Sequence, residues 1–443
     1  MKKLFYNIKN MFAISFWDSI YKIFLFKDLF RTTIPFVQRI YIKKSQKKQK
    51  NTLEKIKSKP VITVAFFLQT PSTWKYDKLY RLFEKSERFK PIVVICPFNI
   101  HLNYSKNEMM LVMKKTEEFA KNQNYNYILT FDKQNKKWLN IRKIINPDIV
   151  FFTKPYKDTL PQYYIYQFRD KITCYTPYAF ICLNIYQLNY GLPLFNLLKY
   201  FFVETDFQKQ FAQKYLLIKG ENAVITGYLG TEPLIDGHKP DDIWKKQDKL
   251  KKRIIWAPHH TIDYLFNFSN FLIYCDLMLD LAKKYEDKIQ FVFKPHPVLK
   301  FKLINLWGEE KTNQYYEKWQ NLPNTQIEEG YYIDLFLASD AMIHDCASFT
   351  AEYLLTLKPV CFMVRDKKNV QKQWNPFGEK AFNLHYQAHN KEEIESFINN
   401  VVLAENDTMY DSRKAFYDEY LYPKDGVMPS EKILKVLEND ISD

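Results

Sequence analysis

The sequence predicts an α/β protein of two domains, each built on a doubly wound parallel sheet. Two series of apolar runs alternate with stretches of helical periodicity, as in proteins whose parallel strands are joined by helices. A polar and charged stretch at 236–252 separates the two series, and 443 residues suffice for two ordinary domain cores. We therefore expect a first domain over 61–235 and a second over 253–443. A basic segment, 1–60, precedes them.

The first series begins with the continuous apolar run at 61–68, which is typical of a strand buried on both faces. A helical stretch is expected at 108–122. Further strands of this series are expected at 91–97, 127–130, 172–178 and 224–228, and the stretch 144–155 is expected to hold a helix end, a turn and a strand. Ligands of such sheets bind at the carboxyl ends of the strands, so the loops that follow these runs are candidate binding loops.

The second series shows the same alternation. Helices are expected near 271–285, 332–338 and 349–357, and the tail at 391–442 is expected to be helical. The strands of this series are expected at 253–258, 289–293, 325–327, 341–344 and 359–363. The second domain therefore repeats the plan of the first.

Glycine and cysteine usage excludes several kinds of site. The chain has nine glycines and no GxxxxGK[ST] or GxGxxG motif, so phosphate must be held by helix N-termini, histidine or basic side chains. The six cysteines show no CxxC spacing, which argues against a disulfide framework or a structural zinc site. These patterns predict neither a dinucleotide cofactor nor a structural metal.

The positive charge is concentrated at the N-terminus. Residues 1–60 hold 15 of the 65 Lys and Arg residues but only three of the 50 acidic ones. A nucleic-acid-binding protein is expected to carry its basic residues on the folded domains. Their concentration in residues 1–60 therefore argues against nucleic-acid binding. Large apolar residues over 4–42 alternate with charges, a pattern typical of a helix lying in a membrane interface and broken at Pro35.

A lysine cluster follows this stretch, and it would be drawn to anionic lipid. Its members are Lys43, Lys44, Lys47, Lys48 and Lys50. We expect residues 1–50 to bind an anionic membrane surface. The alternative is an amphipathic helix packed on the protein's own body.

Histidines follow two expected strands of the second series, and a further one, His344, ends the expected strand at 341–344. His259 and His260 come directly after the strand at 253–258, and His296 follows the strand at 289–293 beside Lys294. The carboxyl ends of parallel strands meet at one edge of a sheet, so these side chains should converge. An imidazole near phosphate oxygens can donate a hydrogen bond or a proton.

The turn at 345–348 opens a further expected helix, whose N-terminal N–H groups suit an anion. Ser348 is expected to cap this helix, with Glu352 one turn on and on the same face.

Three segments in this order resemble the CDP-glycerol glycerophosphotransferase family, whose members make teichoic-acid-like polymers. Lys294-Pro-His-Pro297 is similar to the family's Arg-x-His-Pro segment, and Asp345-Cys-Ala-Ser-Phe-Thr-Ala-Glu352 to its Asp-Tyr-Ser-Ser-x-x-x-Asp motif. Tyr332–Asp345 resembles the Asp-x-x-x-Leu…Ser-Asp run between them.

The resemblance implies a GT-B fold, a CDP-activated donor, no metal requirement and attachment to the cytoplasmic face of the membrane. It also implies that the donor is bound by Lys294, His296, Asp345, Ser348 and Glu352.

The chain departs from the family's pattern in its first half. The family has a Trp-His-Gly-Thr-Pro segment, whose histidine is the expected base. In this chain Tyr190 stands in the place of that histidine. Tyr190 and Gly191 are therefore candidate residues for the acceptor side of the site. Tyrosine is a poor base near neutral pH because its ordinary pKa is about 10. We therefore expect His259 or His260 to be the base. Ala347 also stands where the family has a serine. Lys294 stands where the family has an arginine, and a lysine lacks the guanidinium group that can bind phosphate through two hydrogen bonds at once.

The leading hypothesis is a membrane-associated transferase. It would move glycerophosphate, or a similar polyol phosphate, from a CDP-activated donor to a hydroxyl of a cell-surface polymer or its lipid-linked precursor, releasing CMP. A GT-B glycosyltransferase that uses a sugar nucleotide is the first alternative, and a sugar-nucleotide epimerase of the same fold is a remoter one. A third alternative, from another class, is a non-catalytic scaffold subunit that tethers such a complex to the membrane.

Overall fold

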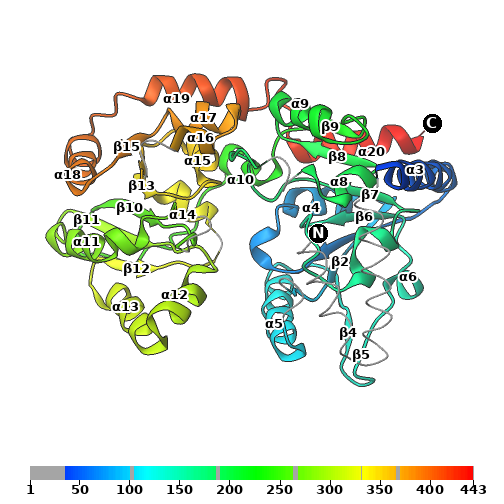
Figure 1. Ribbon diagram of the computed structural model, residues 1–443, viewed down its shortest axis with the longest axis horizontal. Coiled ribbons are helices and arrows are strands. Elements are labelled where there is room, and N and C mark those ends of the chain that lie inside the picture. The colour runs from blue at the N-terminus through cyan, green and yellow to red at the C-terminus, as the bar shows by residue number, and fades with distance from the viewer. Residues whose placement is uncertain are drawn as a thin grey trace.

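The computed structural model contains two parallel sheets in separate halves of the molecule (Figure 1). The structure describes residues 35–99, 104–185, 190–262, 268–330, 332–365 and 370–442.

The first sheet has seven strands in the order β3-β2-β1-β6-β7-β8-β9, all parallel. Its central strand β1 is apolar throughout and its side chains are almost entirely buried, as expected of a strand covered by helices on both faces. The strands are β1 (Ile62–Leu68), β2 (Phe89–Ile95), β3 (Tyr127–Leu129), β6 (Ile149–Phe152), β7 (Ile172–Tyr175), β8 (Tyr200–Val203) and β9 (Ala223–Ile225). A short antiparallel hairpin of β4 (Phe131–Asp132) and β5 (Lys137–Trp138) stands apart from this sheet.

The second sheet has six parallel strands in the order β12-β11-β10-β13-β14-β15. The strand order reverses at β10, which lies between β11 and β13, and this is where ligands bind in open α/β sheets. The strands are β10 (Lys252–Ala257), β11 (Ile289–Phe293), β12 (Thr325–Ile327), β13 (Ala341–His344), β14 (Val360–Met363) and β15 (Tyr386–Ala388). The predicted fold class, two doubly wound parallel-sheet domains, is confirmed.

Helices cover both sheets. Those of the first half are α3 (Pro35–Lys57), α4 (Asp77–Lys85), α5 (Lys106–Asn122), α6 (Ile141–Ile144), α8 (Pro193–Leu197), α9 (Asp206–Tyr215) and α10 (Glu232–Ile235). Those of the second half are α11 (Phe271–Lys284), α12 (Leu299–Trp307), α13 (Glu309–Asn321), α14 (Ile333–Ala338), α15 (Phe349–Glu352), α16 (Val370–Gln373), α17 (Pro376–Phe382), α18 (Lys391–Ser396) and α19 (Tyr410–Phe416).

The last helix, α20 (Pro429–Ser442), returns to the first half of the molecule, where it lies near α3 and β8 (Figure 1). Ile433, Leu437 and Ile441 are buried in the core of the first sheet, and Glu232 accepts a hydrogen bond from the backbone of Ser430 at the start of the helix. This differs from the expected second domain, which ran unbroken to residue 443. The apolar stripe of α20 finds its partner surface on α4 and α3 instead.

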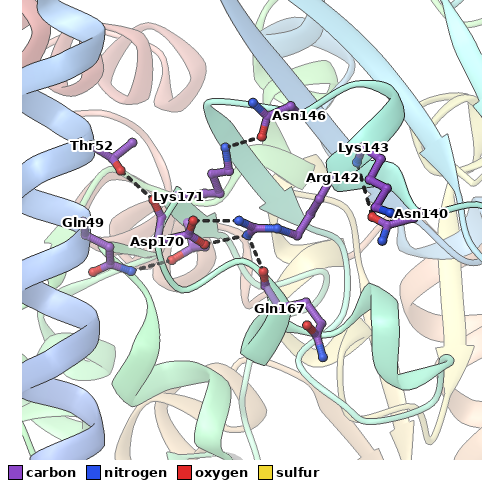
Figure 2. Close-up of polar contacts among 10 residues, drawn as sticks. Gln49, Thr52, Asn140, Arg142, Lys143, Asn146, Gln167, Asp170 and Lys171 are labelled. Carbon is purple, nitrogen blue, oxygen red and sulfur yellow. Dashed lines mark hydrogen bonds and ion pairs between the residues drawn. The ribbon is translucent and has the colours of Figure 1, made fainter.

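Helix α3 is docked on the first half along one face. Gln49 donates to the carbonyl of Leu197 at 2.8 Å. Thr52 donates to the carbonyl of Asp170 at 2.6 Å (Figure 2). Asp170 is itself fixed by two hydrogen bonds from Arg142, of 2.6 and 2.7 Å. For residues 35–57, the alternative of a helix packed on the protein's own body is therefore the one observed. The rest of the expected membrane-interface helix, residues 4–34, lies outside the described residues.

The five lysines of the predicted cluster lie on the opposite, exposed face of α3; they are Lys43, Lys44, Lys47, Lys48 and Lys50. None of the helices in the described ranges combines the length and apolar character needed to cross a membrane.

The expected linker at 236–252 has mostly irregular structure, but it is packed against the rest of the molecule. Trp244 within it is buried in an apolar cluster that also contains Phe180 and Tyr228 of the first half and Phe377 of the second. Gly378 makes this contact possible, because a Cβ at this position would lie 2.1 Å from the carbonyl oxygen of Cys182. The two halves therefore meet through a packed seam.

Candidate active site

Three histidines converge at the carboxyl ends of β10 and β11. The ring centroid of His260 lies 4.3 Å from that of His259 and 4.2 Å from that of His296. The centroids of His259 and His296 are 5.0 Å apart. The loops that carry them are tied together by a hydrogen bond of 3.2 Å from the backbone of His296 to the carbonyl of Pro258. We call these three residues the histidine cluster.

The tautomer of His296 follows from its surroundings. Its Nδ1 accepts a hydrogen bond of 3.2 Å from the backbone N–H of Val298, so the proton of the neutral ring sits on Nε2. Burial lowers the pKa of His296 well below its usual value, and the neighbouring charges of His260, Lys302 and Lys294 lower it further. His296 is therefore a neutral ring whose Nε2–H can donate to a phosphate oxygen.

The same hydrogen bond bears on metal binding. One ligand nitrogen from each of the three rings lies within 4.8 Å of the others, which is close enough for a shared ion. A metal-bound histidine normally donates its second N–H to an acceptor. His296 does the reverse, because its Nδ1 accepts a backbone N–H and its Nε2 then has no lone pair to offer. The donor set fits an anion better than a cation.

Asp345 fixes the loop that carries His259. Its two carboxylate oxygens accept hydrogen bonds from the backbone N–H groups of His259, at 2.6 Å, and Asn270, at 2.5 Å. Burial raises the pKa of Asp345 to about 6, and these backbone donors oppose the rise. The structure thus places this predicted donor-binding residue behind the histidine cluster, where it positions the loops after β10 and before α11.

Lys294 is also committed within the protein. Its ammonium group is buried and donates to the carbonyl of Gly330 at 3.0 Å and to that of Glu328 at 3.4 Å. Burial lowers its pKa to about 8. This predicted phosphate ligand therefore holds the loop after β12, and the charge it adds to the site acts over a longer distance.

Ser348 stands directly before α15 but does not cap it. Its backbone is helical and its hydroxyl makes no capping hydrogen bond, so the capping prediction is wrong. The sulfur of Cys346 lies 3.7 Å from the Ser348 hydroxyl. A half-buried hydroxyl at this position is well suited to meet a phosphate oxygen that arrives beside the helix start.

Glu352 lies where the two halves of the molecule meet. Its carboxylate accepts a hydrogen bond from the hydroxyl of Tyr332 and lies 3.3 Å from the hydroxyl of Tyr228 in the first half. Lys75, also in the first half, donates to the Tyr332 hydroxyl at 2.8 Å. Burial raises the pKa of Glu352, and the charge of Lys75 opposes the rise.

Comparison of the sequence with models of known protein families identifies the family of this chain. Residues 194–439 match the family model of the CDP-glycerol:poly(glycerophosphate) glycerophosphotransferases, which is more than half of the chain. The chain belongs to this family. It is therefore a transferase of the CDP-glycerol glycerophosphotransferase type, and the matched residues include the histidine cluster and the 345–352 segment.

Solved structures share the fold at low sequence identity. A variant of the wall teichoic acid polymerase TagF is 14% identical, with a TM-score of 0.54 over 94% of this chain and 98% of that one. MnaA of S. aureus, solved with UDP, is 14% identical, with a TM-score of 0.53 over 85% and 96%. The UDP-GlcNAc 2-epimerase of Neisseria meningitidis, solved with UDP-GlcNAc, is 13% identical, with a TM-score of 0.52 over 86% and 100%. The fold is thus GT-B. The sequence has no significant match among curated proteins.

Tyr190 and Gly191, which were predicted on the acceptor side of this glycerophosphotransferase-family chain, lie away from the histidine cluster. Tyr190 is fully buried among the aromatic rings of Phe195, Phe201 and Phe211, within the core of the first half. Tyr190 and Gly191 line a cavity of about 230 Å³ that α3 closes with Tyr41. They also precede the matched residues, which begin at 194. The structure does not bring them together with the histidine cluster.

Several residues at the seam were missed by sequence reasoning. Lys75, Tyr228 and Tyr332 join the two halves around Glu352. None of them was predicted to take part in the site, although Tyr332 begins a segment that resembles the family. Glu204 is different, because it directly follows β8 at the carboxyl end of the first sheet. The rule that strand ends carry ligands would have found it, had the Tyr-Phe-Phe-Val run been recognised as a strand.

Proposed function

We propose that the chain transfers glycerophosphate, or a similar polyol phosphate, from a CDP-activated donor to a hydroxyl of a cell-surface polymer or its lipid-linked precursor. The acceptor oxygen forms a new bond to the β-phosphorus of the donor, and the bond from that phosphorus to the CMP oxygen breaks. CMP leaves with the electron pair of the broken bond. Membership of the glycerophosphotransferase family supports the choice of donor.

The observation that carries the proposal is the tautomer of His296. A neutral imidazole with its proton on Nε2 offers one hydrogen bond to a phosphate oxygen, and the helix start at 348–349 follows β13, the neighbour of β10 on the side away from β11. These groups supply hydrogen bonds and partial charges to a diphosphate without a Gly-rich loop. The predicted roles of Lys294 and Asp345 then become those of supports for the loops that bind the donor.

His259 and His260 complete the wall of this site. The Nδ1 of His259 lies 3.0 Å from the hydroxyl of Thr261, and its ring stacks on Phe268 at 4.9 Å between centroids. Burial lowers the pKa of His259 well below its usual value, and His296 and His260 lower it further. A strongly lowered pKa makes a ring a weak proton acceptor. The assignment of His259 or His260 as the catalytic base therefore stays a prediction, and the geometry of the two rings adds no support to it.

We further propose that the protein works at the cytoplasmic face of the membrane. The exposed lysine face of α3 supports electrostatic attraction to anionic lipid, and Phe36 and Ile40 at the start of the helix are 72% and 41% exposed. Since the other face of α3 is packed on the body, this helix would lie against the lipid headgroups through its lysines rather than through an apolar stripe.

A thermal-shift screen tests the donor. CDP-glycerol, CDP-ribitol, CTP and UDP-sugars would be added to the full chain and to a His296→Ala variant, with His389→Ala as the matched control, since His389 pairs locally with Glu393. A ligand at 100 times its dissociation constant stabilises by about 2.7 kcal/mol. We expect CDP-glycerol or CDP-ribitol to stabilise the wild type and the control, and His296→Ala to lose most of the shift. Stabilisation by UDP-sugars alone would favour the glycosyltransferase, and no stabilisation by any of them would favour the scaffold.

A further inference from the structure

Glu204 is a buried carboxyl group without an evident structural task. It directly follows β8, its side chain is 4% exposed, and neither carboxylate oxygen has a hydrogen-bond partner in the described part of the chain. Buried polar atoms are nearly always paired, and each exception needs a physical reason. A bound ligand that supplies the missing partner is one such reason.

Other polar atoms at the same sheet edge share this condition. The hydroxyl of Thr176 follows β7, and the side-chain nitrogen of Gln208 lies in the first turn of α9. Both are buried without a partner among the residues that the structure describes. A carboxyl, a hydroxyl and an amide nitrogen can together accept from and donate to the hydroxyl groups of a polyol. The first sheet thus presents a polar edge suited to a hydroxylated acceptor.

This edge lies on the seam that faces the donor-binding half. Cys182, whose pKa is raised by burial and then by the Glu204 carboxylate, accepts through its carbonyl a hydrogen bond of 2.9 Å from the backbone of Asn375 in the second half. Tyr228, whose pKa is also raised in part by Glu204, lies 3.3 Å from Glu352 of the 345–352 segment. Glu204 is therefore on the first-half side of the seam that this segment reaches from the other side.

We propose that Glu204 is the general base that accepts the proton of the acceptor hydroxyl during transfer, an inference that rests on the proposed function. The O–H proton moves to a Glu204 oxygen as the acceptor oxygen bonds to phosphorus and the bond to CMP breaks. Glu204 then returns the proton to water or to the departing CMP phosphate. The carboxyl is shielded from water in this arrangement, and a site that excludes water protects the reacting phosphorus from hydrolysis.

The protonation of Glu204 suits this task. Burial raises its pKa to about 8. The titratable groups that face it are Tyr175 on β7, Cys182 and Tyr228, each with a pKa raised by burial and so uncharged near neutral pH. A base with a pKa near the working pH combines a usable ionised fraction with a strong pull on the proton. The rate of transfer should rise with pH up to about 8 and then level off.

The test compares Glu204→Gln and Glu204→Asp with the wild-type full chain, using CDP-glycerol as donor and glycerol as a soluble acceptor. Glu232→Gln is the matched control, since Glu232 is a buried carboxyl of the same half whose pKa burial raises to about 7, but it binds the backbone of Ser430. We expect Glu204→Gln to slow CMP release at pH 8 by about a hundredfold or more and to flatten the pH profile. Glu204→Asp should keep part of the rate, and the control most of it.

Binding of the donor separates the two proposals. CDP-glycerol should shift the melting temperature of Glu204→Gln as much as that of the wild type, because the base does not hold the donor. A Glu204→Gln rate within threefold of the wild type would overturn the base assignment, as would a slower variant with an unchanged pH profile. A wild-type chain that neither binds CDP-glycerol nor releases CMP would instead overturn the proposed function.

Discussion

The hydroxyl of Tyr228 lies 3.3 Å from the carboxylate of Glu352, across the seam between the two sheets. The same hydroxyl donates to the carbonyl of Tyr178 at 2.7 Å, and it has only one proton to give. The Tyr228 hydroxyl therefore shares its proton between the Tyr178 carbonyl in its own half and the Glu352 carboxylate in the other. The predicted donor-binding carboxylate is therefore part of the contact between the two halves.

Removing the Tyr332 hydroxyl should loosen this contact. Tyr332→Phe leaves Lys75 and Glu352 buried with one hydrogen bond fewer each, so we expect a loss of about 1–3 kcal/mol in the free energy of unfolding. Denaturant unfolding measures it. Tyr422→Phe, at a partly exposed ring, is the control and should change stability little. Equal stability of Tyr332→Phe and the wild type would argue against a structural role for this contact.

Gly378→Ala should disturb the seam from the other side. The new Cβ would lie 2.1 Å from the carbonyl oxygen of Cys182, and backbone must move to relieve the clash. Overpacking of this kind costs about 1–3 kcal/mol. Gly330→Ala is the control, since its Cβ would meet open space. A Gly378→Ala variant that unfolds at the same denaturant concentration as Gly330→Ala would contradict the packed seam.

Asp345→Ala should release the loop that carries His259. Two buried backbone N–H groups, of His259 and Asn270, would lose their acceptor, each at a cost of about 1–3 kcal/mol. We expect lower stability together with weaker CDP-glycerol binding. Asp287→Ala, at an exposed ion pair, is the control, and pairs of this kind contribute little. Weaker donor binding with unchanged stability would instead mean that Asp345 contacts the donor directly.

Charge removal on α3 tests membrane attachment. Each lysine near an anionic surface contributes about 1 kcal/mol, so replacing Lys44, Lys47 and Lys48 by Gln should weaken binding to phosphatidylglycerol vesicles by roughly a hundredfold. Sedimentation with the vesicles measures this. The matched control replaces three exposed lysines of α5 by Gln: Lys114, Lys115 and Lys121. Equal sedimentation of both variants and the wild type would contradict a specific role for α3.

Much of the fold was predictable because its strands are long apolar runs. β1, β10 and β11 stand out as such runs, and the convergence of His259, His260 and His296 follows from parallel strands ending at one edge. Strand β8 was missed because only two residues separate it from α8, so its apolar run merges with that of the helix, and the three-residue β15 was missed as well. Missing β8 also hid Glu204.

The rest depended on tertiary contacts that no local pattern encodes. Lys294 looks like a phosphate ligand beside His296, but the carbonyls of the loop after β12 capture its ammonium group. Tyr190 aligns by spacing with a family histidine, yet an aromatic ring of its size is buried in the core instead. The return of α20 to the first sheet depends on which surface its apolar stripe meets.

Identification of the released nucleotide distinguishes attack on phosphorus from attack on a sugar carbon. The full chain would be incubated with CDP-glycerol and glycerol, and the products separated by anion-exchange chromatography, for the wild type and His296→Ala. We expect CMP from the wild type and a loss of about a hundredfold or more in His296→Ala, since removing one hydrogen-bond donor to the developing charge costs about 3 kcal/mol. Release of CDP instead of CMP, or equal CMP release by both proteins, would contradict it.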